Sequence, residues 1–171
     1  MNELELLLER WANFYLITSA AAATLIGLLF VIITLGAERG VKGGADKIRM
    51  YLTPTTAYFA SVLILAALLT FPNHTRLTAI LCICCVGVGG LVYSASPLIR
   101  RGRRDYEQLD LIPYAVFPSA AYGLLAMGGV LLLHDPQRGL TLVAVGMLSL
   151  LVVAIRNSWS IAVDVVSARP G

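Results

Sequence analysis

Long hydrophobic blocks separated by short polar segments form the main pattern of this sequence. Five blocks of about 16 to 25 residues contain almost no charged side chain. A bilayer core of about 30 Å is crossed by about 20 helical residues. The pattern therefore predicts an all-α, polytopic transmembrane helix bundle with five spans in one transmembrane domain, residues 1–171. The spans are expected at about 11–35, 55–71, 77–99, 112–133 and 140–157.

Prolines and short connections suggest how these spans begin, end and pair. Pro54 is expected just inside the start of the second span, where proline is tolerated, and Pro72 is expected to end it. The connections 72–76 and 134–139 are too short to hold a domain, so the helices should pack as antiparallel neighbours. The fifth helix has two possible ends, near Ile155 or past Arg156 at about Ser167.

Composition removes several classes of function. Of the 171 residues, 58% are hydrophobic and 13% are charged, whereas soluble domains usually carry about 25% charge. The first ten residues are acidic rather than basic, so the first hydrophobic segment is expected to remain in the mature protein. The sequence contains no GxSxG, HExxH or CxxC motif and no glycine-rich phosphate loop. We therefore expect no enzymatic activity and no cofactor.

The distribution of basic residues predicts the orientation of the spans. Ten of the 13 Lys and Arg residues lie between spans one and two, between spans three and four, or after the last span. The positive-inside rule then places the N-terminus outside and the C-terminus inside. The basic residues lack the interleaved aromatic residues of a nucleic-acid surface, so no nucleic-acid partner is expected.

Small residues at helical spacing are candidate helix-packing positions. In a bilayer, helices associate through close contact of small side chains and through interhelical hydrogen bonds. Five short helices enclose little interior, so at least one such seam is expected to face another subunit or a second copy of the chain. The candidate packing residues are Ser19, Ala23, Gly27, Gly89, Gly90, Ser119 and Gly123.

Two proline-led segments at the starts of spans two and four are weakly similar. Pro54-Thr55-Thr56-Ala57-Tyr58 matches Pro118-Ser119-Ala120-Ala121-Tyr122 at three of five positions. Each segment is followed about 22 residues later by a Leu-Thr pair. One interpretation is a parallel repeat of two hairpins, and the other is chance similarity within a restricted set of residue types.

Few polar residues lie close enough to a span to take part in chemistry. Arg156, Asn157 and Asp164 are the candidates for lining a pore, because ionisable groups within spans are costly and often functional. Alternatively, Arg156 reaches the headgroups while Trp159 anchors the interface. A cluster of four arginines is a candidate contact for anionic lipid headgroups or an acidic partner. These residues are Arg100, Arg101, Arg103 and Arg104.

Metal ligation has only a weak basis in this sequence. His74, His134 and Asp135 fall in loops on the predicted outer side and would meet if spans two to five pack as a bundle. Two histidines and one aspartate would still need further ligands, and solvated loop histidines are the alternative. Cys82, Cys84 and Cys85 share one span and are interpreted as small packing residues rather than a metal site.

Two segments resemble a known group of proteins. Asn13-Phe14-Tyr15 with the stretch 18–31, and the closing Ile155-Arg156-Asn157-Ser158-Trp159, are similar to an uncharacterised family of small bacterial inner-membrane proteins. Residues 54–61 match more loosely. That family often has an Asp after the tryptophan, where this chain has Ser160. The resemblance implies a multi-pass protein of the bacterial inner membrane and implies no activity.

Taken together, these features favour a non-enzymatic structural or accessory subunit of a membrane assembly, with lipids and other membrane subunits or itself as partners. A small homo-oligomeric channel or transporter is the alternative, in which Thr18, Thr24, Ser61, Arg156 and Asn157 line one polar path. A third hypothesis is a metal-dependent, lipid-modifying enzyme at the outer rim. This last hypothesis requires His74, His134 and Asp135 to converge.

Overall fold

The computed structural model describes residues 3–38, 45–71, 75–99 and 115–167. These residues form five α-helices, and the described part of the chain contains no strand. The all-α prediction is therefore confirmed. The helices are α1 (Glu3–Glu38), α2 (Ala45–Leu69), α3 (Arg76–Ile99), α4 (Phe117–Leu131) and α5 (Pro136–Ser167).

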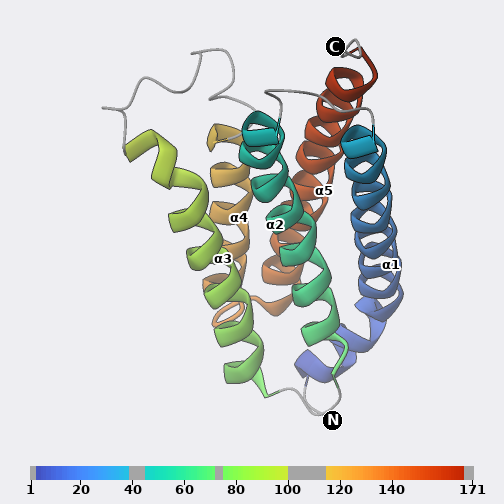
Figure 1. Ribbon diagram of the computed structural model, residues 1–171. Helices are drawn as coiled ribbons and strands as arrows, with labels where there is room; N and C mark the ends of the chain where they lie inside the picture. The colour runs from blue at the N-terminus through green and yellow to red at the C-terminus, as the bar shows by residue number, and fades with distance from the viewer. Residues whose placement is uncertain (1–2, 39–44, 72–74, 100–114, 168–171) are drawn as a thin grey trace.

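The helices pack side by side as a bundle in which each helix runs antiparallel to the next (Figure 1). Helix α4 packs most extensively, with α3 on one side and α5 on the other. Helix α2 lies against α1 and α5, and it contacts α3 less closely. The ends of α1, α3 and α5 lie at one end of the bundle, which we call the C-terminal end. The opposite end, where these three helices begin, is called the N-terminal end.

Four of the helices are long and apolar enough to cross a membrane: α1, α2, α3 and α5. Helix α4 is also apolar but has only 15 residues, or about 22 Å at 1.5 Å per residue. A short π-helical turn at 115–116 precedes it, and Pro118 lies in its first turn, where a missing N–H costs no intrahelical bond.

Helix α1 begins eight residues before the expected first span. Leu4 and Leu8 are one helical turn apart and are both buried, whereas Glu9 and Arg10 are exposed. The first turns are therefore amphipathic, and they run beneath the N-terminal end of the bundle before the helix turns upward (Figure 1). A search for uninterrupted hydrophobic stretches misses these turns because charged residues alternate with the leucines.

The expectation that Pro54 lies at a helix start is wrong. Helix α2 begins at Ala45, so Pro54 lies in the helix interior. Proline has no N–H to donate, and the carbonyl four residues earlier loses its usual partner. Membrane helices tolerate this loss because hydroxyl side chains and neighbouring helices can satisfy the carbonyl.

Helix α5 continues through Arg156 to Ser167 instead of ending near Ile155. Its buried positions continue at helical spacing as well, from Leu150 through Ala154 and Asn157 to Ile161. The apolar face of α5 therefore extends past the arginine, and a single charged side chain does not end the helix. Of the two possible ends of the fifth helix, the structure has the later one.

Candidate functional site

The seam between α3 and α4 depends on glycines. A Cβ atom built at Gly87 would lie 2.7 Å from the backbone nitrogen of Ala126, which no side chain tolerates. At Gly129 the same atom would lie 2.8 Å from the Sγ of Cys84. At Gly90 it would overlap the ring of Tyr122. The two helices can therefore approach to backbone contact only because these positions lack side chains.

Tyr122 joins three helices at the centre of this seam. Its ring lies over Gly90 of α3, and its hydroxyl is 2.8 Å from the Oγ of Ser61 on α2. The ring centroid of Tyr58, also on α2, lies 6.1 Å from that of Tyr122 in an edge-on arrangement. One fully buried side chain thus connects α2, α3 and α4 by packing and by a hydrogen bond.

A second interhelical hydrogen bond lies one turn from Tyr122. The Oγ atoms of Ser94 on α3 and Ser119 on α4 are 3.0 Å apart. Ser94 is buried, and its hydroxyl is also 3.3 Å from the carbonyl of Leu91. The two hydroxyl contacts join α2 to α4 and α3 to α4, and they help to fix how these helices are oriented in an otherwise apolar interior.

We predict a measurable coupling between Tyr122 and Ser61. Interhelical hydrogen bonds in membrane proteins contribute about 0.6 kcal/mol on average and up to about 1.7. Tyr122→Phe and Ser61→Ala should each lower the free energy of unfolding, and the double variant should lose less than their sum by about that amount. Unfolding of the four proteins in mixed micelles measures this cycle. Strictly additive losses would show that the contact contributes nothing.

The seam between α4 and α5 uses three further glycines. A Cβ atom at Gly128 would lie 2.9 Å from the backbone carbonyl oxygen of Gly139, and a Cβ atom at Gly139 would lie 2.9 Å from that of Gly128. At Gly146 it would lie 2.8 Å from a methyl group of Leu125. Gly139 and Gly146 are seven residues apart and so lie on one face of α5. None of these three glycines is among the predicted packing residues, although the seven-residue spacing on α5 could have indicated the second seam.

The predicted packing residues divide into two groups. Gly90 and Ser119 lie in the α3–α4 seam, as described above. Gly27, Gly89 and Gly123 have no neighbouring heavy atom within 4 Å of a built Cβ. Ala23 is exposed, and Ser19 is half-buried with its hydroxyl donating to the carbonyl of Leu16 at 2.9 Å. Of the predicted packing residues on α1, Ala23 and Gly27 are therefore exposed and Ser19 is only partly covered, whereas the neighbouring Ala22 is buried in the core.

The candidate pore-lining residues do not share one face. Thr24 and Arg156 are exposed, whereas Thr18 and Asn157 are buried. The hydroxyls of Thr18 and Thr24 donate to carbonyls of their own helix, each at 2.8 Å. The side chain of Asp164 lies outside the described residues, although its backbone belongs to α5. The structure thus divides these polar groups between the interior and the outer surface of the bundle.

Two fully buried polar side chains have no hydrogen-bond partner in the part of the chain that the structure describes. They are the hydroxyl of Tyr15 on α1 and both amide atoms of Asn157 on α5. Leaving a buried polar group unpaired costs about 1–3 kcal/mol. Sequence analysis singled out Asn157 for its polarity, but only the structure shows that its amide is enclosed.

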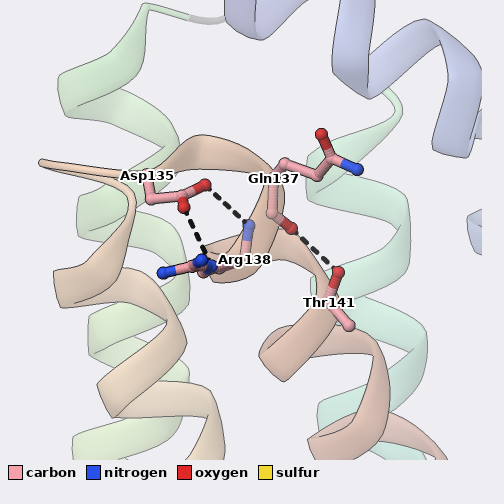
Figure 2. Close-up of polar contacts among 4 residues, drawn as sticks. All are labelled: Asp135, Gln137, Arg138 and Thr141. Carbon is pink, nitrogen blue, oxygen red and sulfur yellow. Dashed lines mark hydrogen bonds and ion pairs between the residues drawn. The ribbon is translucent and has the colours of Figure 1, made fainter.

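Asp135 caps helix α5 at the N-terminal end of the bundle (Figure 2). One carboxylate oxygen accepts a hydrogen bond from the backbone N–H of Arg138 at 3.0 Å, and the other lies 3.2 Å from the Nε of Arg138. Pro136 follows the cap at the first helical position. The hydroxyl of Thr141 donates to the carbonyl of Gln137 at 2.9 Å. The carboxylate thus has a structural role at the helix start.

Of the three residues of the predicted outer-rim metal site, His74, His134 and Asp135, only Asp135 takes part in the side-chain contacts described above. His134 is exposed beside Asp135, and His74 lies outside the described residues. Among the described residues, no group of three His, Cys, Asp or Glu side chains is placed to hold a metal ion. The arginine cluster, Arg100, Arg101, Arg103 and Arg104, also lies outside the described residues.

The described fold defines an all-helical protein with four helices long and apolar enough to span a membrane. Around Tyr122, its interior contains a glycine seam between α3 and α4 and a hydroxyl contact from Tyr122 to Ser61. No protein-family model, curated protein or solved structure matches the chain.

Proposed function

We propose that this chain is a non-enzymatic structural or accessory subunit of a membrane assembly, acting through helix packing. The observation that carries the proposal is the outward face of α1, which combines exposed small residues with a lack of intrachain contact. Ala23 and Gly27 are exposed at four-residue spacing, and among the described residues no heavy atom lies within 4 Å of a Cβ built at Gly27.

The position of α1 in the bundle supports this interpretation. Six glycines of α3, α4 and α5 lie against a neighbouring helix, namely Gly87, Gly90, Gly128, Gly129, Gly139 and Gly146, whereas Gly89 and Gly123 are open. Helix α1 packs mainly against α2 and α5. A second helix can approach a surface of small residues closely and gain van der Waals contact there, whereas lipid tails gain little such contact. The seam on α1 is thus suited to a helix from another subunit or a second copy.

The proposed topology has five spans, with the N-terminus outside and the C-terminus inside a bacterial inner membrane. The distribution of Lys and Arg along the sequence supports the orientation, since ten of 13 lie between spans one and two, between spans three and four, or after the last span. The resemblance of residues 13–31 and 155–159 to bacterial inner-membrane proteins supports the location. Helix α4 would span the bilayer together with the turn that precedes it.

We predict that Gly27→Leu weakens assembly without unfolding the chain. The new side chain would project from α1 where no atom of the chain lies within 4 Å, so it should leave the bundle intact. The same side chain would prevent close approach of a second helix. Size-exclusion chromatography with light scattering in mild detergent, together with crosslinking in native membranes, measures the oligomeric and copurifying species.

Gly89→Leu is the matched control. Gly89 is also an exposed helical glycine with open space around it, but it lies on α3 rather than on α1. Loss of the assembled species with Gly27→Leu but not with Gly89→Leu would locate the contact on α1. An unchanged assembly with Gly27→Leu, at unchanged thermal stability, would contradict the proposal for this helix.

A further inference from the structure

The outer surface of α5 carries one cation among several exposed apolar side chains near the C-terminal end of the bundle, with the exposed Ser160 one turn away. Val152, Ile155, Trp159 and Val163 are exposed, with Trp159 exposed by 73%. Arg156 is exposed between them. We call these five residues the Arg156 face.

The depth of Arg156 is set by the length of α5. Arg156 follows Pro136, the first residue of α5, by 20 residues. At 1.5 Å per residue this is about 30 Å, the thickness of the hydrocarbon core. With the α4–α5 turn at one surface, Arg156 lies at the opposite boundary. Trp159 lies one turn further along, at the level where tryptophans anchor the interface.

The charge of Arg156 lacks a protein counter-ion among the described residues. The ion pair found in that part of the chain joins Arg138 and Asp135 at the other end of α5. A guanidinium on an apolar surface at the edge of the hydrocarbon is stabilised by an anion at the same depth. The oxygens of a phosphodiester fit its planar donor fork.

We propose that the Arg156 face binds an anionic phospholipid. Arg156 holds the headgroup phosphate, Trp159 lies at the glycerol level, and Val152 with Ile155 lines the acyl chain. The site rests on the proposed membrane topology but not on assembly through α1. It is separate in sequence from the arginine cluster at 100–104, and it lies on a helix surface that also offers apolar contact for an acyl chain.

Lipid titration of the full-length protein tests this site. The protein, purified in detergent, is titrated with phosphatidylglycerol and separately with phosphatidylcholine, and bound lipid is counted by native mass spectrometry. A basic residue near an anionic surface contributes about 1 kcal/mol, so Arg156→Gln should weaken phosphatidylglycerol binding about fivefold. Arg156→Lys should bind phosphatidylglycerol more tightly than Arg156→Gln but less tightly than the unmodified protein, because lysine keeps the charge and lacks the planar donor fork.

Arg138→Gln is the matched control, because it removes the same charge from a guanidinium that is already paired with Asp135. The arginine cluster remains in both variants, so the difference between them reports position 156. Equal binding by the Arg156→Gln and Arg138→Gln variants would overturn the proposal. Equal affinity of the unmodified protein for phosphatidylcholine, or displacement of the bound lipid by inorganic phosphate alone, would overturn it too.

Discussion

Gly90→Ala should lower the free energy of unfolding by up to about 2 kcal/mol, because overpacking a well-filled core costs about 1–3 kcal/mol and the gain in helix propensity offsets part of that cost. The added methyl group would overlap the ring of Tyr122, which is fully buried. The ring cannot simply move aside, because its hydroxyl contacts Ser61 on α2 and its edge contacts Tyr58. The substitution should therefore separate α3 from α4 and weaken the contact with α2.

Gly89→Ala, one residue earlier, is a closely matched control. A Cβ at Gly89 meets no heavy atom within 4 Å, so the added methyl group should cause no overlap. Replacing glycine by alanine inside a helix also gains about 0.8–1.0 kcal/mol of helix propensity at either position. The two variants should consequently change stability in opposite directions. Thermal unfolding in detergent, followed by circular dichroism, measures both, and a similar gain in both would show that Tyr122 does not require a glycine opposite it.

Asn157→Leu should raise the free energy of unfolding by about 1–3 kcal/mol, the cost of enclosing an unpaired polar group. Asn157 is fully buried, and neither amide atom has a hydrogen-bond partner among the described residues. Leucine has the same branched shape at the γ position and brings no polar atom into the core. Chemical unfolding in mixed micelles measures the change.

Asn13→Leu separates burial from helix propensity in this experiment. Asn13 is exposed on α1, so the same substitution there gains helix propensity without removing a buried amide. A larger gain at position 157 than at position 13 is the expected result. A loss of stability with Asn157→Leu would show that the amide has a hydrogen-bond partner in the folded protein and stabilises the fold.

Sequence patterns correctly predicted five helices and their order because long hydrophobic blocks have few other solutions in a membrane. They were less successful at helix ends. The first turns of α1 contain Leu4 and Leu8 between acidic residues, and α2 continues through Pro54. Helix ends depend on local contacts and on capping, whereas hydrophobic blocks report only the part of a helix that is continuously apolar.

Packing residues were harder to predict than helices. Small residues lie on several faces of each helix, and four-residue spacing cannot tell which face meets a neighbour. Gly89 and Gly90 are adjacent in sequence, but only Gly90 lies against another helix. The direction of each face depends on the rotation of the helix within the bundle, which the other helices determine.

The segments led by Pro54 and Pro118 also show the difference between what residue spacing predicts and which residues meet in the fold. The two tyrosines that close these segments, Tyr58 and Tyr122, lie in edge-on contact in the folded chain. The sequence shows that the segments are alike, but it does not show that they meet. Their contact depends on α2 and α4 running in the same direction through the bundle.

The all-helical, apolar character of the chain can be read from the residue pattern alone, because helix length and hydrophobicity are local properties. The pattern also contains the polar residues available for function, including Arg156 and Asn157. The folded arrangement of the helices turns Arg156 outward and encloses Asn157, and it packs Gly90 while leaving Gly27 open. Adjacent helical residues point about 100° apart, so the placement of neighbouring helices assigns each one to the interior or the surface.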